Sequence, residues 1–144
     1  MLERVLIHQE SDIGIAIVTV RSRAMALNFS QDRVDRLCTA VSELARNIVK
    51  YARGCSADLL IMDWPDPDNS EHIQGLVIQA RDNGPGIDDL HASLQDHVSS
   101  SGSLGLGLPG VKRLVDEFDI ISQTRRQAGA GGTVVTIRMG AKSR

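Results

Sequence analysis

The sequence predicts an α/β (α+β) two-layer sandwich, in which a mixed or antiparallel sheet carries helices on one face. Three observations support this fold class. An amphipathic pattern that ends at Tyr51 is typical of a long helix with one buried side. Two apolar runs, Ala57–Trp64 and Ile73–Arg81, have the length of paired strands, and a further helix and two strands follow. We expect one domain over residues 1–144.

The first part of the chain predicts one short strand and one helix. Val5–His8 suits the strand, and Ser11 or Asp12 offers an N-cap for the helix. Apolar residues then recur at helical spacing: Ile13, Ile17, Val20, Ala24 and Leu27. Because several of them are β-branched, a strand over Ile13–Val20 remains an alternative.

The next helix has clearer signals at both ends. Ser30 is a good N-cap, Asp32 favours the positive end of the helix dipole, and Gly54 is a natural stop. One apolar stripe runs between them: Val34, Leu37, Val41, Leu44, Ile48 and Tyr51.

The rest of the chain alternates turns with short elements. Pro65–Ser70 is a polar turn between the two strand runs, and a helix is expected over roughly Asp88–Gln95. The serine- and glycine-rich segment His97–Gly107 has little to bury, so we expect a mobile lid there. Pro109 suits the first turn of a helix that docks through Val111, Leu114, Val115 and Phe118. The expected closing strands are Asp119–Thr124 and Thr133–Met139, around a Gly129–Gly132 turn.

Composition argues against several classes of partner. The formal net charge is −2, from 16 basic and 18 acidic residues. This balance does not indicate binding to nucleic acid or to a membrane surface. We expect no signal peptide, and no apolar run approaches the ~18–20 residues that span a bilayer. Cys38 and Cys55 match neither a metal-binding spacing nor a disulfide framework. We expect free thiols in a reducing cytoplasm.

Glu43 and Asn47 lie one helical turn apart, with Lys50 near the same side, at the polar border of the apolar stripe. A carboxylate there can accept a proton while the amide oxygen ligates a hard cation. Mg²⁺ takes few protein ligands and completes its shell with water and substrate phosphates. An exposed polar helix face is the alternative interpretation.

Asp82 follows an apolar strand, and Gly84 and Gly86 flank Pro85. Asp, Gly and Pro residues in this order are typical of a β-turn, and a plain turn is one interpretation. The same residues let the backbone approach a flat ligand while Asp82 accepts a hydrogen bond from an exocyclic amine, such as that of adenine.

Gly105, Gly107 and Gly110 match the pattern G-x-G-x-x-G. A dinucleotide-binding interpretation fails, because no strand leads into the motif and no acidic residue follows about 20 positions later. Glycines before a helix N-terminus still leave backbone N–H groups for an anion, and a phosphate fits. Ser99–Ser103 would then belong to the lid.

In this order the motifs resemble the nucleotide boxes of the GHKL superfamily of gyrase, chaperone, histidine kinase and mismatch-repair ATPases, whose pocket is the Bergerat fold. Glu43–Asn47 resembles the N box, Asp82–Gly86 the G1 box and Gly105–Gly107 the G2 box. Thr133, after two glycines, resembles the residue that closes the adenine site. The resemblance covers roughly residues 5–139.

Within this superfamily the run Gly105–Phe118, together with Ala45–Ile48, is similar to the RsbT-type switch kinases of bacterial partner-switching pathways. The run Leu108–Leu114 separates it from the anti-sigma-factor branch. The resemblance implies a protein serine/threonine kinase that phosphorylates a STAS-domain antagonist and, when free, activates a phosphatase partner.

The resemblance also implies ATP and Mg²⁺ as cofactors and gives each motif a role. Asn47 would ligate Mg²⁺, and Glu43 would be the catalytic base. Asp82 would hold the adenine amine. The other implied nucleotide contacts are Gly84 and Gly86 at the base, Gly105 and Gly107 at the phosphates, and Thr133 at the adenine site. Arg46, Lys50 and Lys112 are the candidate cations for the γ-phosphate, and the sequence does not choose among them.

Three other functions remain as alternatives. The first is an anti-sigma factor whose nucleotide state gates binding of a sigma subunit. The second is the catalytic domain of a sensor histidine kinase, although none of the four histidines lies on a coiled-coil-like helix. The third is an α/β domain that binds no nucleotide.

Overall fold

The computed structural model describes residues 1–52, 54–87, 107–124 and 131–143. Its elements are β1 Leu2–Leu6, α1 Glu10–Ala26, α2 Gln31–Tyr51, β2 Ala57–Asp66, β3 Asn69–Asp82, α4 Gly107–Leu114, β4 Glu117–Gln123 and β5 Gly132–Gly140. The helix expected over Asp88–Gln95 and the lid expected before Gly107 lie outside the described residues.

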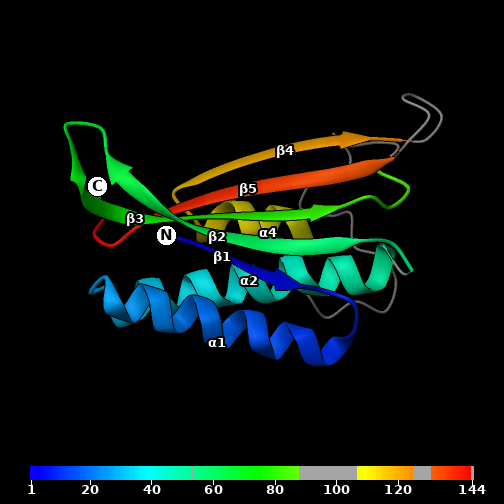
Figure 1. Cartoon of the computed structure of the whole chain (residues 1–144), viewed down its shortest axis with the longest axis horizontal. Helices are drawn as coiled ribbons and strands as arrows, with labels where there is room; N and C mark the ends of the chain where they lie inside the picture. Colours follow the sequence, from blue (N-terminus) through cyan, green and yellow to red (C-terminus); the bar gives the residue numbers. More distant parts are fainter. Residues whose placement is uncertain (53, 88–106, 125–130, 144) are drawn as a thin grey trace.

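The five strands form one sheet in the order β1-β2-β3-β5-β4, and each neighbouring pair is antiparallel. Figure 1 shows helices α1, α2 and α4 on one face of this sheet. The predicted two-layer sandwich is therefore confirmed, and of the two predicted kinds of sheet the antiparallel one is found. No helix in the described segments is long and apolar enough to cross a membrane.

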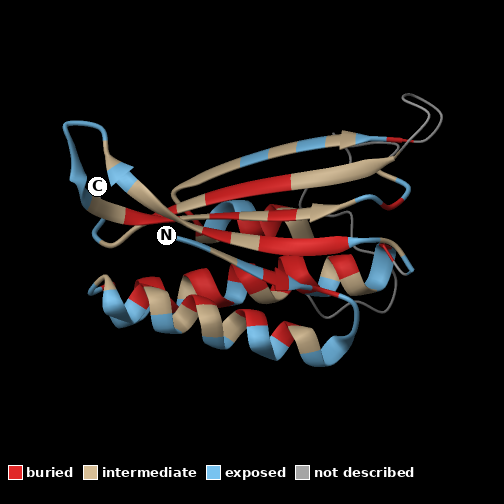
Figure 2. Ribbon diagram, in the orientation of Figure 1, coloured by how far each residue is buried: buried red, intermediate tan, exposed pale blue. Residues whose placement is uncertain are grey.

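The core lies between the sheet and α2, where Figure 2 shows buried residues from both layers facing each other. Alternate strand residues supply one side, because successive side chains point to opposite faces of a sheet. They include Leu59, Ile61, Leu76, Ile78, Ile137 and Met139, all fully buried. Val34, Leu37, Val41, Leu44 and Ile48 of α2 supply the other side, as predicted. Burying each such side chain contributes about 1.5–3 kcal/mol.

Helix α1 is a helix, not the alternative strand, but its start differs from the prediction. The N-cap is Gln9, and Asp12 lies in the first turn. The Asp12 carboxylate accepts the backbone N–H groups of His8 at 2.8 Å and Gln9 at 3.1 Å. Asp12 therefore satisfies donors that precede the helix, which is the reciprocal half of a capping box.

Helix α2 begins as predicted, since the Ser30 side chain accepts the backbone N–H of Arg33 at 3.3 Å. Two predictions near helix ends differ from the structure. Tyr51 is 51% exposed at the end of the helix, with Lys50 Nζ 5.0 Å from its ring centroid. Phe118 packs against the core as predicted, but it lies on β4 and not on the helix, because α4 ends at Leu114.

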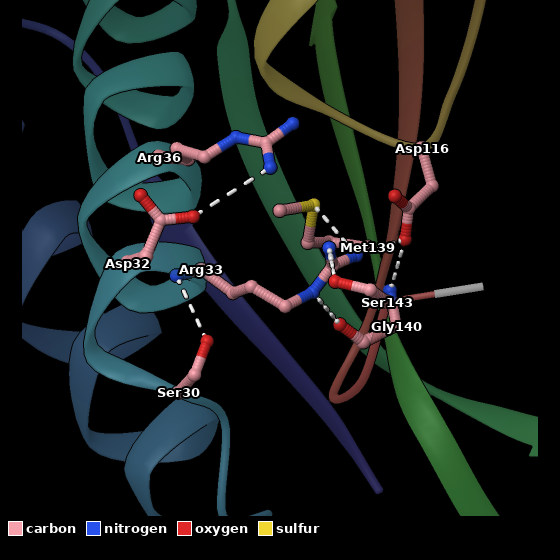
Figure 3. Close-up of polar contacts among 8 residues, drawn as sticks. All are labelled: Ser30, Asp32, Arg33, Arg36, Asp116, Met139, Gly140 and Ser143. Carbon is pink, nitrogen blue, oxygen red and sulfur yellow. Dashed lines mark hydrogen bonds and ion pairs between the residues drawn. The ribbon is translucent and has the colours of Figure 1, made fainter.

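A buried guanidinium joins the start of α2 to the far ends of α4 and β5 (Figure 3). Arg33 Nε donates to the carbonyl of Gly140 at 2.8 Å, and an Arg33 Nη pairs with the Asp116 carboxylate. Ser143 Oγ accepts a third bond at 3.4 Å, and Asp116 also accepts the Gly140 N–H at 2.8 Å. We call Arg33, Asp116, Gly140 and Ser143 the Arg33 clamp. It fixes α4 against α2 at the end away from Glu43.

Candidate functional site

Glu43 is buried between α2 and α4, with a side chain only 8% exposed. Its Oε2 accepts the backbone N–H of Gly107 at 3.4 Å, and its Oε1 accepts Arg46 Nη1 at 3.0 Å. The sequence predicted that Glu43 lies at the polar border of the helix, so its burial differs from the prediction. It arises because the first residue of α4 lies directly against the carboxylate. The Gly107 bond is long, so Oε2 keeps much of its capacity to accept a stronger donor.

Asn47 follows one turn later and is half-buried, while Arg46 and Lys50 are exposed. Within the described part of the chain the Asn47 side-chain amide has no hydrogen-bond partner. An amide oxygen is a hard ligand, so its chemistry fits Mg²⁺. The described residues contain no group of three His, Cys, Asp or Glu side chains that could enclose a metal ion.

Asp82 ends β3, and its Oδ1 accepts the Gly84 N–H at 2.9 Å. Burial raises the pKa of the Asp82 carboxyl above its ordinary value, and the bond from Gly84 opposes that shift. Gly86 has a φ of +79°, and a Cβ there would lie 2.2 Å from the carbonyl oxygen of Gln123. Only glycine fits that position, so the turn is held tightly against β4.

The Asp82 turn touches both α2 and β5. A Cβ on Gly84 would lie 3.1 Å from the Cβ of Ala52, the C-cap of α2. Thr133 of β5 is the direct ladder partner of Asp82. The N-box helix, the G1-like turn and the predicted Thr133 position therefore meet at one end of the sheet.

Ser122 of β4 is a site neighbour that the sequence analysis missed. Its hydroxyl lies 2.8 Å from Thr133 Oγ1 and accepts the backbone N–H of Ile87 at 2.9 Å. Ser122 thus ties the Asp82 turn to the last two strands. No motif marks it, because the contact depends on the pairing of Ser122 with Thr133 across β4 and β5.

The predicted residues are arranged in a definite order along α2. Glu43 is at the α4 contact, Asn47 comes one turn later, and Ala52 at the helix end meets the Asp82 turn. Nine residues of helix span about 13 Å. The Glu43 carboxylate and the Asp82 turn are thus separated by about that length along α2, with Asn47 between them. Gly105, the remaining predicted contact, lies outside the described residues.

Comparisons with known proteins identify the family and the fold. The family model of the histidine kinase-like ATPase domain matches residues 10–139. Serine/threonine-protein kinase RsbT of Bacillus subtilis (strain 168) is 42% identical over 134 residues, covering 93% of each chain. The solved structure of the mycobacterial sensor histidine kinase MprB aligns with a TM-score of 0.56 over 97% of each chain. At 21% identity that last similarity concerns the fold alone.

The family model covers most of the chain, and the RsbT relative covers nearly all of it. The predicted superfamily is thereby confirmed. The predicted enzyme class, a protein serine/threonine kinase, is also the class of the RsbT relative. The chain belongs to the family of histidine kinase-like ATPase domains.

Proposed function

We propose that this chain is an ATP-dependent protein serine/threonine kinase of the RsbT type. The order of groups along α2 carries the proposal: a buried carboxylate at Glu43, an available amide at Asn47, and a helix end against the Asp82 turn. That order matches the γ-phosphate, the metal and the adenine of Mg-ATP. The similarity to RsbT supports the same activity.

Each predicted site residue then has a role. Asp82 accepts the adenine amine, with Gly84 and Gly86 giving the base close access to the backbone. Thr133 closes the adenine site beside Asp82. The Gly107 N–H, together with Gly105, contacts phosphate at the start of α4. Asn47 holds Mg²⁺, which when bound offsets phosphate charge. Arg46 and Lys50 are the nearby cations on α2.

The chemistry required of the protein is mainly positioning. The acceptor hydroxyl gives its proton to Glu43 as its oxygen bonds to the γ-phosphorus. The bond from that phosphorus to the β,γ-bridging oxygen breaks, and ADP leaves with the electron pair. A carboxylate that is buried and only weakly bonded at Oε2 is suited to take that proton.

The proposed protein partners come from the resemblance to switch kinases. We propose a STAS-domain antagonist as the phosphorylated protein and a phosphatase as the protein that the free kinase activates. Cys38 and Cys55 form no disulfide in the part of the chain that the structure describes, in keeping with the proposed reducing cytoplasm.

The test combines nucleotide binding with phosphate transfer. Purified chain is incubated with labelled ATP, magnesium and a panel of STAS-domain proteins, and ATP affinity is measured by calorimetry. Asn47→Ala should abolish magnesium-dependent ATP binding without unfolding the chain, whereas Asn69→Ala at the start of β3 should change neither. Unchanged ATP affinity in Asn47→Ala removes Asn47 from the metal role. A stable sigma-subunit complex without phosphate transfer favours the anti-sigma alternative.

A further inference from the structure

A groove of about 300 Å³ lies between the first turn of α1 and the second half of α2. Its lining residues are Glu10, Ile13, Arg46, Val49 and Lys50, and we call it the α1–α2 groove. All five are among the described residues. Arg46 and Lys50 are also candidate cations for the γ-phosphate, whereas the other proposed nucleotide contacts meet α2 through Gly107 of α4 and the Asp82 turn.

The groove has an apolar floor and a basic rim. Ile13 is only 7% exposed and Val49 packs against the core. Arg46 and Lys50 outnumber Glu10, so the lining carries one net positive charge at neutral pH. Its volume is at the lower end of the range for small-molecule sites, which suits one or two side chains. The chemistry complements an extended protein segment with an apolar side chain beside a carboxylate.

Arg46 connects this groove to the proposed catalytic base. Arg46 is one of the lining residues, and its guanidinium donates to Glu43 Oε1 at 3.0 Å. The Arg46 side chain is 51% exposed, while that of Glu43 is 8% exposed. The second Arg46 contact, to Ser42 Oγ, is long at 3.4 Å. The Arg46 side chain is therefore open to an incoming anion, whereas the Glu43 side chain is largely shielded from solvent.

We infer that the α1–α2 groove binds an acidic segment of the protein substrate and that Arg46 exchanges Glu43 for that segment's carboxylate. This rests on the proposed function for the identity of the substrate. When Arg46 turns to the new anion, Glu43 Oε1 loses its partner and can accept a hydrogen bond from the acceptor hydroxyl. Arg46 is then a positioning residue that frees Oε1, in addition to the weakly bonded Oε2, when the protein substrate is bound.

The experiment uses nuclear magnetic resonance on the full chain with two synthetic ten-residue peptides. The first carries Glu-Leu-Glu beside a serine, and the second carries Lys-Leu-Lys in the same place. The acidic peptide should shift the backbone amide signals of the five groove residues and the side-chain carboxyl carbon signal of Glu43. The basic peptide should shift neither.

Three variants test whether the charged residues of the groove determine its affinity for the acidic peptide. Arg46→Gln should raise the dissociation constant of the acidic peptide about two- to fivefold, as for a half-exposed ion pair, and remove its effect on the Glu43 signal. Glu10→Gln should lower the constant by a similar factor. Arg21→Gln is the matched control and should leave the constant unchanged. Arg21 lies on α1 outside the groove, its side chain is 42% exposed, and it pairs with Asp35 at 3.5 Å, so it resembles Arg46 in exposure and in having one acidic partner.

Several results overturn the inference. They are equal binding of both peptides, no groove shifts with the acidic peptide, and shifts of Glu10 and Ile13 caused by Mg-ATP alone, which would make the nucleotide the occupant. Calorimetry with Mg-ATP on the same samples separates the two proposals. If ATP binds and phosphate is transferred but the acidic peptide does not bind the α1–α2 groove, only the proposed role of the groove is wrong. If ATP does not bind, the proposed kinase function falls, and the peptide result still decides the groove.

Discussion

The two ends of the α2–α4 contact use charged side chains in opposite ways. At one end the Arg33 guanidinium has partners on Asp116, Gly140 and Ser143, and it is almost fully buried (Figure 3). At the other end the Glu43 carboxylate is also buried, but it has one long bond to Gly107 and one bond to the exposed Arg46. Both charges have hydrogen-bond partners, but the buried Arg33 has three, whereas one of the two at Glu43 is the exposed Arg46.

The difference suggests that the Arg33 end of the α2–α4 contact stabilises the fold, whereas the Glu43 end serves the proposed reaction. Burying a charge costs several kcal/mol unless its partners are well placed, so the Arg33 clamp is suited to a fixed structural role. A carboxylate with acceptor capacity left over is suited to receive a ligand or a proton. Substitutions at the two ends should therefore have different effects on activity and stability.

The largest effect is expected from Glu43→Gln, which keeps the shape of the side chain and removes the base. The rate of phosphate transfer should fall about 10²–10⁴-fold, while ATP affinity remains near its original value. Single-turnover transfer of labelled phosphate and calorimetry measure the two quantities. Glu71→Gln, at an exposed position of the β2–β3 hairpin, is the matched control. Near-normal turnover in Glu43→Gln would reduce Glu43 to a structural residue.

The next largest effect is expected from Arg33→Met at the opposite end. The change leaves the Asp116 carboxylate without its main cation, so the free energy of unfolding should fall by about 3–5 kcal/mol. Urea unfolding followed by circular dichroism measures this loss. The transfer rate per folded molecule should stay close to normal at saturating ATP. A large loss of rate with little loss of stability would contradict the division between the two ends.

Asp82→Asn tests a third carboxylate, whose role is proposed to be ligand binding. Loss of the charged acceptor should weaken ATP binding on the order of 10–100-fold. Because the pKa of Asp82 is raised in the fold, its ionised form destabilises the protein at neutral pH, and this penalty is relieved as the pH falls. The variant should therefore melt slightly higher than the original chain at pH 7.

The same raised pKa gives Asp82 a pH signature. Protonation begins at a higher pH than for an aspartate of ordinary pKa, 3.8, so ATP affinity should weaken early as the solution is acidified. Calorimetry on samples acidified stepwise from neutral pH measures this trend. An equal pH trend in Asp82→Asn would assign the titration to another group.

The smallest effect is expected from Arg36→Met, which lies about one helical turn after Arg33 on α2. Arg36 pairs with Asp32 at 3.7 Å, and the Asp32 side chain is 79% exposed (Figure 3). Such a pair contributes less than about 1 kcal/mol. Urea unfolding should therefore be nearly unchanged, and a loss as large as that of Arg33→Met would mean that burial does not explain the difference.

Much of the fold could be predicted because its signals are local. The stripe from Val34 to Ile48, the Ser30 cap and the alternation in β2 and β3 each depend on residues within one element. Tyr51 and Phe118 were misplaced because a helix end and a strand start were decided by packing instead of periodicity. The N-cap of α1 was misplaced because Asp12 serves the residues before the helix.

The candidate site divides in the same way. Its residue types and their order, Glu43 and Asn47 on a helix, Asp82 before a glycine turn and Gly107 before another helix, could be recognised as a nucleotide-binding pattern. The sequence did not predict the burial of Glu43 or the role of Ser122. It also gave no sign that Arg33 would be a structural cation and Arg46 a groove residue.

The sequence alone determined which groups are available and how each repeats along its own helix or strand, because side-chain chemistry and backbone periodicity act over a few residues. Only the tertiary structure decided which of these groups meet. The contacts of Glu43 with Gly107 and of Arg33 with Asp116 join residues 64 and 83 positions apart. Whether such pairs form depends on strand register and helix packing across the whole chain, and those also decide how much water each charge keeps.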